Sequence, residues 1–196
     1  KASFGFRSEN FLMFDGMIEL IFATNNAHKV EEMQAIVPSS IKVISLKEAG
    51  IDIDIPEPFD TLEENATEKS SVIQRITGLN TFSEDTGLEV EALNGEPGVK
   101  SARYAGEEKS FDKNIEKLLT KLRDEKNRKA RFRAVISLFW NGKEFLFEGI
   151  SDGLITEHPK GSQGFGYDPV FQPNGSVKTF GEMDLEEKTQ YSHRKR

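Results

Sequence analysis

The chain has 196 residues, of which 36% are hydrophobic and 30% are charged, as in a soluble globular protein with one well-buried core. It contains no cysteine, which excludes disulfides and thiol catalysis and suits the cytoplasm. The formal net charge of −7 argues against a non-specific DNA or RNA binder, and no apolar run approaches the roughly 18 residues that a membrane-spanning helix needs. We therefore expect a cytoplasmic protein with no nucleic-acid or membrane partner. A small anionic ligand remains compatible with this charge, because its site needs only a few local cations.

Residues 1–16 differ from the rest of the chain. Their sequence, KASFGFRSENFLMFDG, has no clean periodicity, and its charged residues exclude a signal-peptide core. We interpret them as a leader or as a segment added for expression. Met17 begins a natural first strand, so residues 17–196 are expected to form a single domain.

The segment after Met17 predicts the strand–helix–strand start of an α/β fold. Residues 18–23 form a run that is apolar apart from Glu19, and from Lys29 onward apolar side chains recur at helical spacing. Residues 42–46 predict a second strand. The strict alternation of IDIDI, residues 51–55, predicts a short half-buried strand.

The next segment predicts a helix followed by two strands. Thr61 and Glu64 have the spacing of a capping box, so the helix is expected over residues 62–76. A strand should follow it, then a polar turn at residues 84–87 and an alternating stretch that ends at Asn94-Gly95. This part of the chain therefore predicts a helix and a β-hairpin.

The second half of the chain carries one clear helix and one clear hairpin. The helix is expected over residues 111–125, with an apolar stripe of Ile115, Leu118, Leu119 and Leu122. Two apolar runs around Asn141-Gly142 predict the hairpin. Together these elements predict a mixed α/β domain with a mixed sheet and a long antiparallel ribbon.

The junction between the first strand and the first helix is a candidate anion site. Unpaired backbone N–H groups and the positive end of the helix dipole attract anions at a helix start. Asn25 and Asn26 can cap or donate, and Lys29 adds a full charge in the first turn. The glycines of a Walker loop are missing. The simpler alternative, that Thr24 or Asn25 merely caps the helix, is the commoner situation for such residues.

Lys69 supplies a second candidate cation. Its spacing from Ala66 and Ile73 places it on the inward face of the predicted helix. A lysine at such a position either extends its ammonium to solvent or meets an anion. Extension to solvent is the default, but a second inward cation strengthens the case for a phosphate ligand.

Three carboxylates are candidates for metal-assisted chemistry. Glu84 and Asp85 stand at a predicted strand end, where adjacent side chains point to opposite faces, and Glu57 lies between two prolines. Mg²⁺ typically takes one or two carboxylates together with waters and phosphate oxygens. Carboxylates, lysines and a helix start are what metal-assisted attack on a phosphate chain requires. An ordinary hairpin turn explains the EDTG run equally well.

The segment GSQGFGYDPVFQPNG is a candidate base-binding loop. Glycines on both sides of Phe165 allow the backbone to approach a flat ligand on which the ring can stack. A purine fits this description, and so does a tight aromatic turn in the core. Downstream, Lys178, His193 and Arg194 add donors that could read a base edge, although a basic tail is more often solvated.

Taken together, these residues resemble the inosine triphosphate pyrophosphatase (Ham-like) family, whose members remove non-standard purine nucleoside triphosphates. The resemblance runs from about Met17 to Arg194. Each motif is weak alone, but their order and spacing are specific: TNNAHK, ENATEKS, SEDTGLEVEALNGEPGVKSARYAG, GFGYDPVF, KTFGEM and SHR.

The resemblance implies a fold and a reaction. The fold would be an elongated mixed α/β sheet with flanking helices, forming two lobes around a deep cleft, usually in a homodimer. The reaction would be Mg²⁺-dependent hydrolysis of the triphosphates of inosine, deoxyinosine and xanthosine to a monophosphate and pyrophosphate.

The resemblance also implies roles for individual residues. Glu57 and Asp85 would be the metal carboxylates, with Glu84 as a further candidate, and Asp85 would activate the attacking water. The phosphates would be bound by Thr24, Asn25, Asn26, Lys29 and Lys69, with Thr86 beside them. The base would be held by Phe165, Gly166, Tyr167, Asp168, Lys178, His193 and Arg194.

The chain departs from the family pattern in two places. The family more often has two aspartates and a serine where this chain has Glu84, Asp85 and Thr86, and the longer Glu84 could shift the metal geometry. The family also continues past the SHR motif into a closing helix that this sequence does not contain.

Two rival functions stay open from the sequence. One is a Maf-like nucleotide pyrophosphatase with another base preference, against which the GFGYDP and SHR motifs argue. The other is a non-catalytic nucleotide sensor on the same scaffold. Glu57 and Asp85 argue against a sensor, because a pure binder gains little from negative charge beside phosphate.

Overall fold

A computed structural model describes residues 17–196, so the interpretation of residues 1–16 falls outside the described residues. Within the described part, the strands form one seven-stranded sheet in the order β2-β1-β3-β5-β6-β7, with β4 paired to β3. The parallel pairs are β1 with β2 and β1 with β3, and the other pairs are antiparallel. The strands are β1 (Ile18–Phe22), β2 (Ile41–Ser45), β3 (Thr81–Val90), β4 (Pro97–Gly98), β5 (Lys129–Trp140), β6 (Lys143–Ile155) and β7 (Phe171–Pro173).

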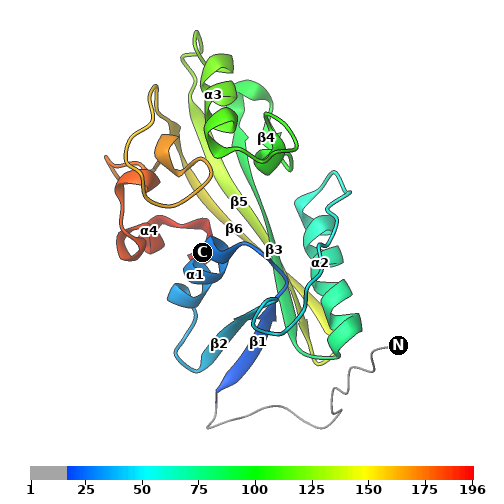
Figure 1. Ribbon diagram of the computed structural model, residues 1–196. Helices are drawn as coiled ribbons and strands as arrows, with labels where there is room; N and C mark the ends of the chain where they lie inside the picture. The colour runs from blue at the N-terminus through cyan, green and yellow to red at the C-terminus, as the bar shows by residue number, and fades with distance from the viewer. Residues whose placement is uncertain (1–16) are drawn as a thin grey trace.

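Helices flank this sheet on both faces (Figure 1). The α-helices of the described chain are α1 (Ala27–Ile36), α2 (Leu62–Thr77), α3 (Phe111–Lys121) and α4 (Leu185–Tyr191). Short 3₁₀ helices are η1 (Glu91–Leu93), η2 (Ser101–Arg103), η3 (Asp168–Val170), η4 (Phe180–Glu182) and η5 (His193–Lys195). The predicted mixed α/β class is therefore confirmed.

The alternation of side chains along β1 explains why α1 and α2 lie on opposite faces. Ile21 belongs to an apolar cluster with Ile73 of α2. Its neighbour Phe22 belongs to another cluster, with Met33 of α1 and Phe82 of β3. Since successive strand residues point to opposite faces, one short strand anchors both helices.

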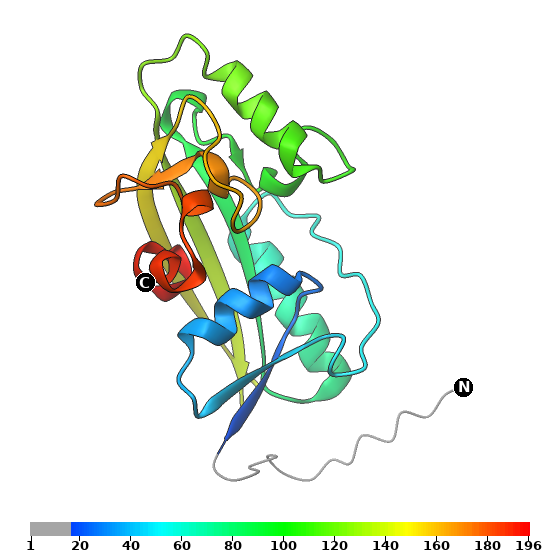
Figure 2. The same cartoon turned by 60° about the vertical axis from the view of Figure 1, so that its left-hand side comes forward.

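A separate core lies at the other end of the long strands and defines a second lobe. Leu88 of β3 and Phe132 of β5 pack there with Leu118 of α3 and with Phe171 and Phe180. Figure 1 shows α3 and β4 at this end and β1 and β2 at the opposite end. Figure 2 shows β3, β5 and β6 running through both lobes, so the lobes share one sheet, as the resemblance implied.

Two local predictions follow the expected physics closely. Thr61 caps α2, and its Oγ1 accepts a hydrogen bond from the Glu64 N–H over 3.2 Å. The β5–β6 hairpin turns at Asn141 and Gly142, whose φ angles of 50° and 75° suit an Asn-Gly turn. Both elements were encoded by short-range signals, and both predictions are confirmed.

The predicted strand at residues 51–55 is wrong. The segment does not pair with a strand of the sheet in the described chain, although its burial alternates as expected. Ile51, Ile53 and Ile55 pack against the cluster beside α2, while Asp52 and Asp54 face solvent. The alternation therefore indicates a segment with one apolar face. An extended segment can have such a face without pairing with another strand.

The predicted polar turn at residues 84–87 is also wrong, because these residues form the middle of β3. Glu84 pairs with Ile136 of β5 and Asp85 with Val135, in a register that continues from Thr81 to Val90. A β-carbon on Gly87 would lie 2.7 Å from the Gly98 carbonyl, so this glycine allows β4 to approach β3 rather than turning the chain.

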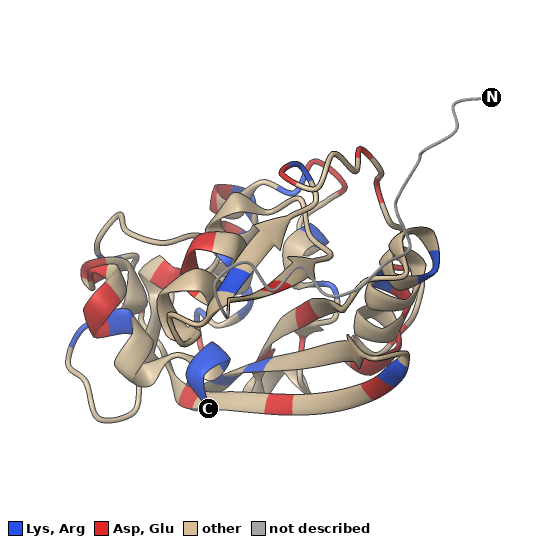
Figure 3. Cartoon of the chain, turned by 90° about the horizontal axis from the view of Figure 1, so that it is seen from below, with Lys and Arg blue, Asp and Glu red and all other residues tan. Residues whose placement is uncertain are grey.

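Two further observations concern the charge distribution and the hydrophobicity of the described chain. Basic and acidic positions are interspersed over the elements drawn in Figure 3, rather than separated by sign. Among the described residues, no helix is both long and apolar enough to cross a bilayer.

Candidate active site

The junction between β1 and α1 is capped by its own side chains. Asn26 is the N-cap of α1, and its Oδ1 accepts hydrogen bonds from the backbone N–H groups of His28 (3.0 Å) and Lys29 (3.3 Å). The Asn26 N–H donates to Oγ1 of Thr24 over 3.2 Å. The cap therefore falls on Asn26 rather than on Thr24 or Asn25, and it partly satisfies the N–H groups that an anion would use.

The other polar side chains of the junction contact distant parts of the chain. Nδ2 of Asn25 donates to the Ile53 carbonyl over 3.0 Å. Nζ of Lys29 donates to the backbone carbonyl of Glu84 over 3.4 Å and lies 3.5 Å from Glu84 Oε1. Burial lowers the pKa of Lys29, and the Glu84 carboxylate opposes this effect.

Lys69 faces inward, as its position on α2 predicted. The buried face of α2 also carries Leu62, Ala66 and Ile73, which fixes the rotation of the helix. Nζ of Lys69 donates to Oε1 of Glu57 (2.5 Å) and to Oδ1 of Asp85 (3.0 Å). The ammonium therefore sits between two carboxylates that are 28 residues apart in sequence.

In the triad of Lys69, Glu57 and Asp85, the pKa values of the two carboxylates shift in opposite directions. Burial raises the pKa of Asp85, and the Lys69 and Lys29 charges reduce the rise. Burial acts in the same direction on Glu57, but the Lys69 ammonium outweighs it and lowers the pKa of Glu57. Burial would lower the pKa of Lys69, but both carboxylates outweigh it and raise that pKa. Asp85 is thus the carboxylate of the triad that holds a proton more readily.

Glu84 points to the opposite face of β3 and is fully paired. Its Oε1 and Oε2 each accept a hydrogen bond of 2.8 Å from the Arg194 guanidinium, and Thr86 Oγ1 also contacts Oε1. Burial would raise the pKa of Glu84, but Arg194 and Lys29 hold it far below its usual range. Glu84 is therefore ionised and occupied by Arg194.

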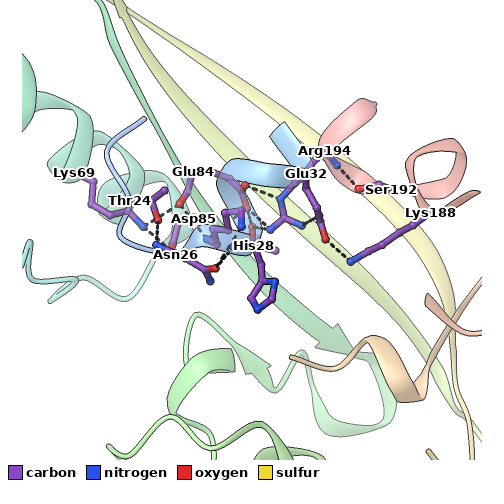
Figure 4. A network of polar contacts seen from close by, with 12 residues as sticks. Thr24, Asn26, His28, Glu32, Lys69, Glu84, Asp85, Lys188, Ser192 and Arg194 are labelled. Atoms are coloured by element: carbon purple, nitrogen blue, oxygen red, sulfur yellow. Dashed lines mark hydrogen bonds and ion pairs between the residues drawn. The ribbon is translucent and has the colours of Figure 1, made fainter. Parts of the chain in front are cut away.

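The Glu84–Arg194 pair continues into a buried ionic network (Figure 4). The Arg194 guanidinium also donates to Glu32 of α1 over 2.7 Å. Lys188 of α4 joins Glu32 to Asp168, with distances of 2.6 Å to each carboxylate. This network ties together α1, α4, β3 and the segment that precedes β7.

A cleft of about 480 Å³ lies beside these groups and has the size of small-molecule sites. Its lining joins the phosphate, carboxylate and base candidates from both lobes. The predicted residues that line it are Thr24, Asn25, Asn26, Lys29, Glu57, Lys69, Asp85, Thr86, Phe165, Gly166, Tyr167, Asp168, His193 and Arg194. Glu84 does not belong to this lining.

The candidate base loop is held by hydrogen bonds at both ends. The Phe165 N–H donates to Oδ2 of Asp168 over 2.8 Å, and the Tyr167 hydroxyl donates to the Ser101 carbonyl over 2.9 Å. Burial raises the pKa of Asp168, and Lys188 opposes the rise. The loop therefore presents its aromatic rings from a fixed backbone.

His193 lines the cleft and has unused hydrogen-bonding groups. Its ring stacks on Phe132, with centroids 5.0 Å apart and planes 19° apart. Both ring nitrogens are buried and lack a hydrogen-bond partner among the described residues. Burial and the Arg194 charge hold the pKa of His193 well below its usual range, so the imidazole is neutral and offers one donor and one acceptor.

Lys178 lies outside the cleft lining. Its exposed side chain pairs with Glu187, with 2.7 Å between Nζ and Oε2. The structure thus separates Lys178 from the other residues that the resemblance assigned to the base.

Comparison with known proteins identifies the family. The profile of the Ham1 family matches residues 20–196. The chain belongs to the Ham1 family. It is 50% identical over 177 residues to a Flavobacterium psychrophilum protein named dITP/XTP pyrophosphatase, covering 90% of this chain and 93% of that one. A Porphyromonas gingivalis protein of the same name is 49% identical over 179 residues, covering 91% and 92%.

Solved structures of Ham1 proteins have the same fold. A HAM1 protein from Coxiella burnetii superposes with a TM-score of 0.81 at 38% identity, covering 91% of this chain and 93% of that one. The Staphylococcus aureus Ham1 protein gives a TM-score of 0.79 at 42% identity, covering 90% and 92%. The resemblance to the Ham-like family and its α/β fold are therefore confirmed.

Sequence reasoning misses several charged residues of this Ham1 site. Glu32 and Lys188 are buried in the ionic network, and Arg103 donates to Oε2 of Glu57 over 3.2 Å. Glu32 follows Lys29 by three residues and precedes the apolar Met33, so it falls near the inward edge of α1. This spacing is the one available signal, and charged helix residues are usually exposed.

Proposed function

We propose that this chain hydrolyses non-standard purine nucleoside triphosphates, namely those of deoxyinosine, xanthosine and inosine, to the monophosphate and pyrophosphate. The names of its Ham1 relatives support this substrate class. The observation that carries the proposal is the Lys69 ammonium between Glu57 and Asp85, in the wall of a cleft that also contains the β1–α1 junction. Cations beside carboxylates suit attack on a phosphate chain.

The phosphate chain would lie against the lobe that contains β1, α1 and α2 (Figure 1). Lys29 and Lys69 supply buried positive charge, which is worth more to an anion than charge in water because the local dielectric is low. Polar groups that line the same wall add uncharged contacts: Thr24, Asn25, Asn26 and Thr86. This assignment makes the junction a triphosphate site even though Asn26 already caps the helix.

Asp85 would accept the proton of the attacking water. Its raised pKa makes it a better base than an exposed aspartate, and Lys69 stabilises its ionised form. The water oxygen forms a new bond to phosphorus as the bond between the α- and β-phosphates breaks. The water proton goes to Asp85, pyrophosphate leaves, and Asp85 returns the proton to solvent.

Glu57 and Asp85 fit a magnesium ion that arrives with the nucleotide. Both contact one ammonium, so their oxygens converge on one part of the cleft wall. Within the described residues no three His, Asp or Glu side chains form a preformed metal cluster, so further ligands would be phosphate oxygens and water. Mg²⁺ would neutralise charge that develops on the phosphates. We leave Glu84 out of this set, because it points to the opposite face of β3 and does not line the cleft.

The base would lie against the loop at residues 165–168. Neutral His193 can pair a 6-carbonyl through its N–H group, and Arg194 has N–H groups beyond the three that bond Glu84 and Glu32. Adenine would place an amine against these donors and leave buried groups unpaired, at about 1–3 kcal/mol each. We leave Lys178 out of the base site because it lies outside the cleft lining.

The test is turnover efficiency for inosine, adenosine and guanosine triphosphates, each with and without Mg²⁺. We expect preference for inosine triphosphate over the other two and loss of activity without the metal. Similar efficiency for inosine and adenosine triphosphates would overturn the substrate class. Tight inosine triphosphate binding without turnover would favour the nucleotide sensor.

We further propose that the protein is a cytoplasmic homodimer, in keeping with a role in the nucleotide pool. The support for a dimer is β6. Among the described residues its outer edge pairs with β7 only at residues 153–155, and Phe145, Leu146 and Phe147 of β6 are about half exposed. An exposed apolar strand edge favours association. Light scattering of the parent protein and of Phe147→Lys tests this proposal. A monomeric parent would contradict it.

A further inference from the structure

His28 is an exposed histidine whose ring lies against the candidate base loop. It occupies the first turn of α1, and its imidazole is nearly parallel to the Phe165 ring, with centroids 5.3 Å apart and planes 12° apart. Phe165 lines the cleft, whereas His28 does not belong to the lining. In Figure 4 the imidazole points away from the buried ionic network. His28 therefore contacts Phe165 from outside the cleft and links α1 to the segment that carries the ring.

The Phe165 ring depends on such contacts for its position. The glycines on either side, Gly164 and Gly166, have φ angles of 73° and 61°, which residues with a β-carbon rarely adopt. The Phe165 N–H bond to Asp168 fixes the backbone, but it does not fix the ring. The Phe165 side chain can still rotate about its own bonds, so the ring is held in place by its neighbours.

The neighbours of this ring differ in their exposure. Buried Lys188 and Arg194 lie 5.2 Å and 5.5 Å from the ring centroid, as cation–π partners. Phe111, at 6.3 Å, is tilted by 47°. His28 alone of these four has its plane nearly parallel to the ring and no part in the cleft lining. It is the neighbour that can be altered without changing the cleft itself.

The His28 imidazole makes no hydrogen bond, ion pair or other ring contact within residues 17–196. Its backbone N–H is bonded by the Asn26 cap, and that bond does not involve the ring. The side chain is exposed, so its removal should leave the fold and the helix cap intact. A loss of function on removal would therefore report the contact with Phe165.

We propose that His28 is a positioning residue that holds the Phe165 ring at the mouth of the cleft, ready to stack on a purine. A ring ordered before binding costs less entropy when the ligand arrives, so the contact would strengthen binding of the base and leave the phosphates unaffected. The purine part of this inference rests on the proposed function. The contact between the two rings does not.

The contact is tested without any ligand by amide hydrogen exchange over residues 159–167. Four proteins are compared: the parent, His28→Ala, His28→Phe and His158→Ala, the last removing another exposed histidine just before the loop. We expect about three- to tenfold faster exchange in His28→Ala, from the usual strength of an aromatic pair. The Phe variant and the His158 variant should match the parent. Unchanged exchange in His28→Ala would overturn the proposal.

The role in binding is tested by calorimetry with inosine monophosphate and with inorganic tripolyphosphate. His28→Ala should weaken binding of the monophosphate about three- to tenfold and leave binding of tripolyphosphate unchanged. His28→Phe should recover the parent affinity for the monophosphate. With inosine triphosphate, KM should rise while kcat stays constant. An equal loss of affinity for both ligands, or no recovery of affinity in His28→Phe, would overturn the proposal. If the parent bound no nucleotide, the proposed function would fail, and the exchange measurement would still decide whether His28 holds the ring.

Discussion

Glu84 and Asp85 are neighbours in β3, yet their side chains face opposite sides of the sheet and meet different partners. On the side of α1, Glu84 is enclosed by Arg194, and the network continues to Glu32 and Lys188. On the side of α2, Asp85 has Lys69 as its partner and lines the cleft. The alternation of a strand thus gives one carboxylate to the interior and the other to the cleft.

The two environments shift the two pKa values in opposite directions. Arg194 holds the pKa of Glu84 far below its usual range, whereas burial raises that of Asp85. Two titratable neighbours pushed apart in this way are a recurrent sign of divided roles. Glu84 acts as an anchor for the guanidinium, and Asp85 is the carboxylate suited to proton transfer.

The largest expected effect comes from Asp85→Asn. Loss of the proposed proton acceptor and metal ligand should lower kcat for inosine triphosphate by about 10²–10⁴-fold. The amide is nearly isosteric, so circular dichroism and inosine triphosphate binding should stay close to the parent. Glu89→Gln is the matched control and should retain activity. Glu89 lies four residues further along β3 and pairs with Arg131. Near-normal turnover in Asp85→Asn would remove Asp85 from the mechanism.

Glu84→Gln should instead act mainly on stability. Removing one partner of a buried ion pair typically costs about 3–5 kcal/mol, because the remaining charge is left uncompensated. Urea denaturation of the parent and the variant measures this difference. At low temperature, where the variant is folded, its turnover should fall far less than that of Asp85→Asn. Unchanged stability would contradict the anchoring role.

Lys29→Ala should produce a smaller effect, confined to the phosphates. A charge-assisted contact is worth about 1.5–3 kcal/mol, so triphosphate binding should weaken roughly 10- to 100-fold. Binding of the bare nucleoside inosine should change little. Lys178→Ala, at an exposed lysine outside the cleft lining, is the control. If binding of inosine and binding of its triphosphate weakened equally, Lys29 would not be a phosphate contact.

The smallest expected effect is on the pH dependence of stability. The folded Glu84 pKa lies below the unfolded value of about 4.3, so the unfolded chain binds more protons in that window and stability falls as pH drops through it. Glu84→Gln should therefore flatten the acid side of the stability curve, by up to about 1.4 kcal/mol per pH unit. Asp85 has the opposite sign, because its raised pKa makes stability fall as pH rises above about 3.9. Denaturation from pH 3 to 6 tests both signs, and an unaltered slope in Glu84→Gln would refute the first.

Much of the fold, and the phosphate side of the site, could be predicted from local patterns in the sequence. The Thr61 cap, the Asn141-Gly142 turn and the inward face of Lys69 each follow from residues within a few positions of one another. The middle of β3 could not be predicted in this way. Its run of Glu, Asp, Thr and Gly resembles a turn, but it pairs with the distant β5, and Lys69 and Arg194 compensate its buried carboxylates.

The ionic network was missed for the same reason. Glu32 and Lys188 look like ordinary solvated helix residues, and they become buried only because α1 and α4 meet around Arg194. Residues 51–55 fail in the opposite sense, since their alternation is local and correct but no strand comes beside them among the described residues. Pairing between distant elements is the information that local patterns lack.

The most direct test of the account is the identity of the products released from inosine triphosphate by the parent protein and by Asp85→Asn. With Mg²⁺, the parent should release inosine monophosphate and pyrophosphate in equal amounts, and the variant should release about 10²–10⁴-fold less of both in the same time. Release of inosine diphosphate and phosphate by the parent, or equal pyrophosphate release by the two proteins, would contradict it.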